Sequence, residues 1–178
     1  MHTVACEPLG LAATHTVVPS EGARGLGGRS WLGRQVPPWD YPALAPAGVL
    51  RSTARDMLSF LRANLDQGPE SLARPLTLAR SSRFDTGGDL QVGLGWHIMP
   101  LHRTPLPWTG SRRRDSPALV WHNGLTLGFA SFAGFVPAAG TGVVVLASRF
   151  RSVTGLGIRI LRELSEGSPR GSPGEERA

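Results

Sequence analysis

The segment 123–148 constrains the fold more than any other part of the sequence, because it carries no charged residue. Its length would suit a membrane-spanning helix, which needs about 20 apolar residues. However, glycine recurs along it, Pro137 interrupts it, and its apolar residues are rich in Phe and Val, which favour strands. The pattern therefore predicts a hairpin over 128–147 with a turn at 137–140, and no membrane span.

The residues 143–146, Val-Val-Val-Leu, are apolar without alternation. This pattern is typical of a central strand that is covered on both faces. Two further strands are predicted upstream, at 91–98 and 118–122. An amphipathic helix is predicted downstream, at 152–164, with Val153, Leu156, Ile160 and Leu164 facing inward. Consecutive strands with short links pair antiparallel, and a closing helix lies across one face of their sheet. We therefore expect an α/β (α+β) fold: an antiparallel sheet with flanking helices.

The first half of the chain offers one clear helix. Ser52 or Thr53 caps its start, Asp56 lies in the first turn, and Gly68 with Pro69 ends the helix. A second, weaker helix is predicted at 72–80, and 19–48 is an irregular, Gly- and Pro-rich excursion. We expect residues 1–164 to form part of one domain and the polar tail 165–178 to be disordered.

All 19 basic residues are arginine, so the chain has no lysine. This excludes a lysine Schiff base, a P-loop lysine and a Ser-x-x-Lys pair within this chain. The single cysteine, Cys6, excludes an internal disulfide. We expect no cofactor and no metal, since His97 and His102 do not form a ligand pattern with His122.

The net charge of +6 and a pI near 11.3 invite a nucleic-acid interpretation. The arginines are nevertheless dispersed, and the one dense run, 112–114, is followed directly by Asp115. Arginine-only basicity is also what a GC-rich genome produces. We therefore expect no nucleic-acid partner. The first residues do not form a signal peptide, so the chain as given is predicted to be cytoplasmic, whereas the location of an extended protein and the oligomeric state stay open.

Several short segments follow one another in a set order and together span about four-fifths of the chain. They are Glu-Pro-Leu-Gly-Leu at 7–11 with Thr16, Val-Pro-Pro-Trp at 36–39 continuing to Gly48, Leu-Arg-Ser-Thr-Ala-Arg-Asp-Met at 50–57, Val-Gly-Leu-Gly-Trp at 92–96 and Trp-His-Asn-Gly-Leu-Thr-Leu-Gly-Phe at 121–129. As an ordered set they resemble the C-terminal half of the beta-lactamase-related serine hydrolases, which include class C beta-lactamases, D-alanyl-D-alanine peptidases and esterases.

The resemblance implies an acyl-serine hydrolase of beta-lactams, D-Ala peptides or esters, with a small-molecule or peptide acyl substrate. It matches the family's Lys/His-x-Gly motif, which lies on an edge strand, to His122, Asn123 and Gly124. It gives the backbone N–H of Leu125 the role of an oxyanion donor, with Asn123 and Gly124 contacting substrate. Trp39, in the Pro-rich loop, is the best candidate for lining a substrate groove. An imidazole there either donates to a substrate carboxylate or moves a proton.

The departures from the family pattern concern the other two motifs. Without lysine there is no Ser-x-x-Lys, and the only tyrosine, Tyr41, is not followed by x-Asn. We expect both motifs to be encoded upstream, the fold to be incomplete at its N-terminus, and the isolated chain to be inactive and poorly stable. Two alternatives stay open: a non-catalytic module that binds acyl ligands, and a basic nucleic-acid-binding protein.

Overall fold

The computed structural model describes residues 2–16, 27–37, 48, 50–101 and 116–167. Within them lies one antiparallel six-stranded sheet, whose order β1-β2-β3-β4-β5-β6 follows the chain. The strands are β1 (Phe84–Asp85), β2 (Gln91–Val92), β3 (His97–Pro100), β4 (Ala118–Thr126), β5 (Phe129–Val136) and β6 (Thr141–Ala147). The helical elements are η1 (His2–Cys6), α1 (Ala54–Arg62), η3 (Ala63–Gln67), α2 (Glu70–Arg80), η4 (Pro137–Ala139) and α3 (Thr154–Gly167).

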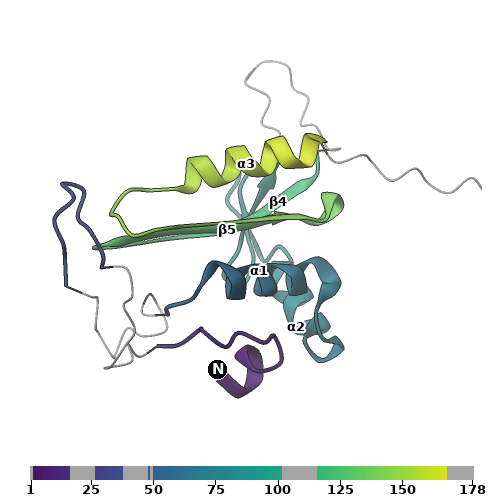
Figure 1. Ribbon diagram of the computed structural model, residues 1–178. Coiled ribbons are helices and arrows are strands. Elements are labelled where there is room, and N and C mark those ends of the chain that lie inside the picture. Colours follow the sequence, from purple (N-terminus) through teal and green to yellow (C-terminus); the bar gives the residue numbers. More distant parts are fainter. Residues whose placement is uncertain (1, 17–26, 38–47, 49, 102–115, 168–178) are drawn as a thin grey trace, which may run out of the picture.

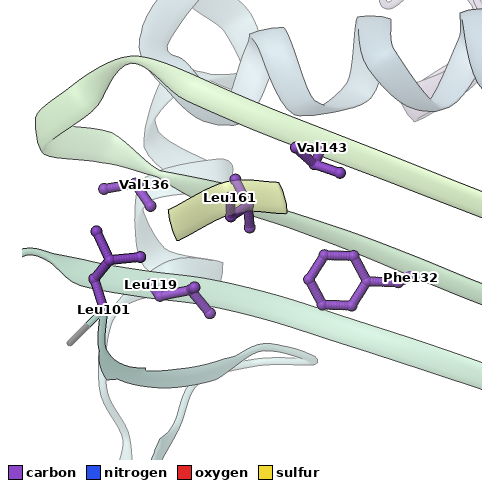
Figure 2. Close-up of a cluster of buried hydrophobic side chains, with 6 residues drawn as sticks. All are labelled: Leu101, Leu119, Phe132, Val136, Val143 and Leu161. Carbon is purple, nitrogen blue, oxygen red and sulfur yellow. The ribbon is translucent and has the colours of Figure 1, made fainter. Parts of the chain in front are cut away.

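The sheet lies between two helical layers, with α3 on one face and α1 on the other (Figure 1). On the α3 side, Leu161 packs with five residues of the sheet and its flanks into a buried cluster (Figure 2). On the α1 side, Leu61 packs with a second buried cluster from β4, β5 and the turn before β3. The first cluster holds Leu101, Leu119, Phe132, Val136, Val143 and Leu161, and the second holds Leu61, Trp96, Val120 and Phe135. This arrangement confirms the predicted fold class.

The valine-rich strand β6 is covered on both faces, as predicted. Val143 and Val145 pack in the α3 cluster, whereas Val144 packs in the α1 cluster. The central position that we expected is wrong for the described residues, because β6 is the last strand in the sheet order. A helix on each face is enough to bury a strand, wherever the strand lies in the sheet.

The predicted strand at 91–98 is two strands. The backbone turns between β2 and β3 with Gly95 at a φ of +79°, a conformation that glycine adopts without strain. The predicted hairpin over 128–147 is confirmed, with Gly140 at a φ of +61° in its turn. Strand β1 was not predicted, and β4 continues to Thr126 rather than ending at residue 122.

Helix α1 begins as predicted, because the Thr53 side chain accepts a hydrogen bond from the Asp56 backbone N–H. Helix α3 faces the sheet only partly as predicted, since Val153 and Ile160 pack against the cluster on its side of the sheet. Leu156 and Leu164, which were expected to face inward, are 42% and 50% exposed, whereas Leu161 is fully buried. The reason is Gly157, where a Cβ would overlap the Phe132 ring, so that the helix approaches the sheet by its glycine.

Helix α3 continues to Gly167, three residues past its predicted end. The remaining residues of the expected disordered tail, 168–178, lie outside the described part of the chain. The uncharged segment 123–148 is built from β4, β5 and β6. Among the described residues, no helix combines the length and the apolar character needed to cross a membrane.

Candidate active-site edge

Strand β4 has two halves with different neighbours. Residues 118–121 pair with β3 on one side, whereas residues 120–126 pair with β5 on the other. Strand β3 begins at His97, opposite Trp121. From His122 to Thr126, β4 therefore has β5 on one side only, and its other side is an open edge within the described chain. The edge strand implied by the resemblance is thus the second half of β4, not the whole strand.

The register decides which backbone groups face this open edge. A two-residue turn, Leu127-Gly128, joins β4 to β5, so that Thr126 and Phe129 form a hydrogen-bonded pair. In an antiparallel ladder, hydrogen-bonded and non-hydrogen-bonded positions alternate. The N–H and C=O groups of Asn123 and Leu125 therefore point away from β5. These groups can pair with an extended ligand or with an oxygen that gains negative charge.

The imidazole of His122 lies beside that of His97, the first residue of β3. Their ring centroids are 5.5 Å apart and their planes are nearly parallel, at 10°. Burial and the neighbouring His97 lower the pKa of His122 below its ordinary value of 6.5, and a backbone hydrogen bond with Asn123 opposes this only in part. At neutral pH, His122 is therefore an uncharged ring that can accept one proton and donate one hydrogen bond.

The side chain of Asn123 is directed to the α3 layer. Its Nδ2 donates a hydrogen bond of 3.0 Å to Oγ1 of Thr154, the first residue of α3. The amide is thus engaged by the fold, and it is the backbone of Asn123 that faces the open edge. This ties the edge to the start of α3.

Gly124 and Leu125 complete the edge. A Cβ at Gly124 would lie 2.7 Å from Oγ of Ser131, its partner on β5, so the close packing of the two strands favours glycine there. Leu125 is 44% exposed. Trp39, the predicted groove residue, lies outside the described residues.

Two flanking segments pack against the end of the β4–β5 hairpin. The N–H of Arg29 donates to the carbonyl of Gly128 at 3.2 Å, and Gly28 lies so close to Gly128 that neither has room for a Cβ. Gly48 lies beside Thr126, the last residue of β4. The Gly- and Pro-rich excursion is therefore anchored beside the open edge at positions 28 and 48.

The structure brings together residues that sequence reasoning treated separately. His97 was considered only as a metal ligand and is instead the ring neighbour of His122. His102 lies outside the described residues, and within the described ranges no three His, Cys, Asp or Glu side chains converge as a metal site would require. The arginine run 112–114 also lies outside them. The contact between the His97 and His122 rings could not be predicted from the sequence, because it depends on the register of β3 and β4.

Comparison with known proteins shows the family of the chain. A family model described as Beta-lactamase matches residues 1–165. The chain belongs to the Beta-lactamase family. A beta-lactamase of Yersinia enterocolitica is 29% identical over 124 residues, which are 56% of this chain and 31% of that protein. A beta-lactamase of Escherichia coli K12 is 29% identical over 127 residues, 59% of this chain and 33% of that protein.

Solved structures show the Beta-lactamase fold of the chain. A beta-lactamase/D-alanine carboxypeptidase from Pseudomonas syringae superposes with a TM-score of 0.74 at 23% identity, covering 92% of this chain and 51% of that one. The chain thus spans about half of this solved structure and about a third of the curated relatives it matches. The motif predicted from the resemblance, at residues 122–124, lies within the region matched by the family model.

Proposed function

We propose that this chain supplies the strand-edge wall of an acyl-serine hydrolase site. In this role Asn123 and Leu125 present backbone groups to an acyl substrate, with the Leu125 N–H as an oxyanion donor and Gly124 and Trp39 beside the substrate. His122 moves a proton at neutral pH or donates a hydrogen bond. The substrate class is a beta-lactam, a D-Ala peptide or an ester.

The open edge of β4 is the observation that carries this proposal. Residues 122–126 combine outward N–H and C=O groups, an uncharged imidazole and a glycine without a Cβ, on one strand whose other side is held by β5. A backbone N–H aimed at a developing oxyanion is worth a factor of about 100 or more in rate. Residues 122–126 contain no serine.

The residue content of the chain leads us to expect no turnover by this chain alone. A lysine-activated serine is impossible in a sequence without lysine, and Tyr41 is not followed by x-Asn. We therefore expect the purified chain to bind acyl ligands and not to hydrolyse nitrocefin or a p-nitrophenyl ester. Saturable turnover that is lost in His122→Ala would overturn this expectation.

Ligand binding at the edge can be tested residue by residue with ¹H–¹⁵N NMR. Titration with benzylpenicillin and with N-acetyl-D-alanyl-D-alanine should shift the amide signals of Asn123 and Leu125 most. The amides of Gly124 and Thr126 are internal controls, because they face β5.

A pair of variants at one position separates the backbone donor from the side chain. Leu125→Pro removes the outward N–H. We expect the affinity for the acyl ligand to fall by roughly 3- to 10-fold, which corresponds to the loss of one hydrogen bond. Leu125→Ala keeps that N–H and is the matched control. Equal affinity of Leu125→Pro and Leu125→Ala would contradict the donor role. Unshifted Asn123 and Leu125 amides would contradict the proposed site itself.

A further inference from the structure

Three aromatic rings follow one another across the end of β3. The His97 ring lies 4.7 Å from the ring of Trp121, its partner in the β3–β4 register. On its other side, it stacks on His122 at 5.5 Å. His97 is therefore held between two neighbours in β4, of which only His122 lies on the open edge.

Two polar atoms among the rings of His97, Trp121 and His122 are enclosed by the fold. The Nδ1 atom of His97 and the Nε1 atom of Trp121 are both buried, and neither has a hydrogen-bond partner in the described structure. A buried polar atom without a partner costs free energy, so its presence calls for an explanation. A ring that only packed against Trp121 would not need nitrogen atoms. A ring that acts on the charge of His122 does need them.

The charge arrangement around His122 makes His97 its main electrostatic neighbour. Apart from His97 and His122, strands β3, β4 and β5 contain no titratable residue. On α1, Asp56 accepts hydrogen bonds from Ala13 and Thr14. The helices that pack on the two faces of the sheet carry Arg55, Asp56, Arg62, Arg159, Arg162, Glu163 and Glu166. Burial lowers the pKa of His122 most, and among the described groups His97 is the titratable neighbour that lowers it further.

We propose that His97 is a positioning residue for His122: its ring, held between Trp121 and His122, fixes the His122 imidazole at the open edge of β4 and opposes a positive charge on it. Two protonated rings 5.5 Å apart would repel each other in a partly desolvated place. The neutral His122 ring then accepts a proton or donates a hydrogen bond. This deepens the proposed function, on which it rests for its substrate consequence.

The substrate consequence is a preference in ligand charge. A permanently charged side chain would attract a substrate carboxylate, whereas a neutral imidazole offers one hydrogen bond and no net charge. At neutral pH the edge should therefore gain little from a carboxylate next to His122. Acyl ligands whose carboxylate is esterified should bind there about as well as their free acids.

The inference is tested first without any ligand. In the full chain, the ring C–H signals of His122 are followed by NMR between about pH 5 and 8, together with nuclear Overhauser contacts between the two imidazoles. We expect direct contacts between the His97 and His122 rings in the unchanged protein. Their absence would overturn the proposal even if every variant failed to fold.

Two substitutions separate the effect of the His97 ring on the position of His122 from the effect of its charge. His97→Phe keeps a flat ring, so the ring-current shift of His122 should persist while its titration midpoint moves to higher pH. His97→Ala should abolish the ring-current shift as well as raise the midpoint. His15→Gln removes a histidine elsewhere and is the control, with no change at His122. A midpoint unchanged in both folded His97 variants would overturn the proposal.

The last measurement compares N-acetyl-D-alanyl-D-alanine with its methyl ester. We expect similar affinities at neutral pH in the unchanged protein, and a gain for the free acid below neutrality that begins at higher pH in His97→Phe. A strong preference for the free acid at neutral pH would overturn the substrate consequence. If neither ligand shifts Leu125, the proposed function fails, whereas the ligand-free titration still decides the role of His97.

Discussion

The two halves of β4 differ in what surrounds them, although they belong to one continuous strand. Residues 118–121 pair with β3, and residues 120 and 121 pair with β5 as well. Leu119 and Val120 are 0% and 3% exposed. Within the described part of the chain, residues 122–126 pair with β5 only, and Leu125 is 44% exposed. The boundary is set by the first residue of β3, His97, which lies opposite Trp121. Because β3 does not extend past Trp121, the next residues of β4 have free backbone groups on that side within the described chain and form the candidate site.

The largest expected effect comes from truncating the same residue type in each half. Leu119→Ala should lower the free energy of unfolding by about 2–5 kcal/mol, because it leaves a cavity in the α3 cluster. Leu125→Ala should change it by no more than about 0.5 kcal/mol. Urea denaturation of both variants measures the difference. Similar losses in the two would mean that the second half of β4 is buried after all.

Proline at neighbouring positions gives a smaller and more specific contrast. Thr126→Pro removes an N–H that bonds to β5, and we expect a loss of about 1–3 kcal/mol in unfolding free energy. Leu125→Pro removes an N–H that faces the open edge, which is where strands tolerate proline, so the loss should be smaller. Thermal unfolding of the pair tests the alternation. If Leu125→Pro were the less stable of the two, the N–H of Leu125 rather than that of Thr126 would bond to β5.

The smallest expected effect is the pH dependence due to His122. Its pKa is lowered in the folded state, so the unfolded state takes up the proton first as the pH falls. The contribution of His122 is therefore fully present above its ordinary pKa of 6.5 and is lost as the pH falls from there through the lowered folded value. Subtracting the unfolding free energies of His122→Gln from those of the unchanged chain over this range isolates the effect. An identical pH dependence in the two proteins would rule it out.

Much of the fold follows from local patterns in the sequence. The glycine- and valine-rich hairpin, the Thr53 cap of α1 and the closing helix were all predicted where they occur, because turn geometry, capping and strand propensity act over a few residues. Predictions failed where a distant partner decides. Which side of α3 faces the sheet depends on how closely Gly157 approaches Phe132. Helical periodicity alone had placed Leu156 and Leu164 on that side.

The candidate site was predictable as a motif but not as an arrangement. Residues 122–124 were identified by their resemblance to an ordered set of family segments, and the family is confirmed. The engagement of the Asn123 amide by Thr154 and the stacking of His97 on His122 were not foreseen. Both contacts join residues that lie at least 25 positions apart, where only packing and strand register bring side chains together.

The sequence by itself determined the family, the antiparallel hairpin and the exclusion of a lysine-dependent nucleophile within this chain, since these follow from residue identity and short-range order. Only the tertiary structure decided where β4 loses its neighbour, which backbone groups face outward and which ring stands beside His122. The physical reason is that these properties depend on strand register and on the packing of two helices against one sheet. Both are set by the free energy of the whole fold rather than by any single segment.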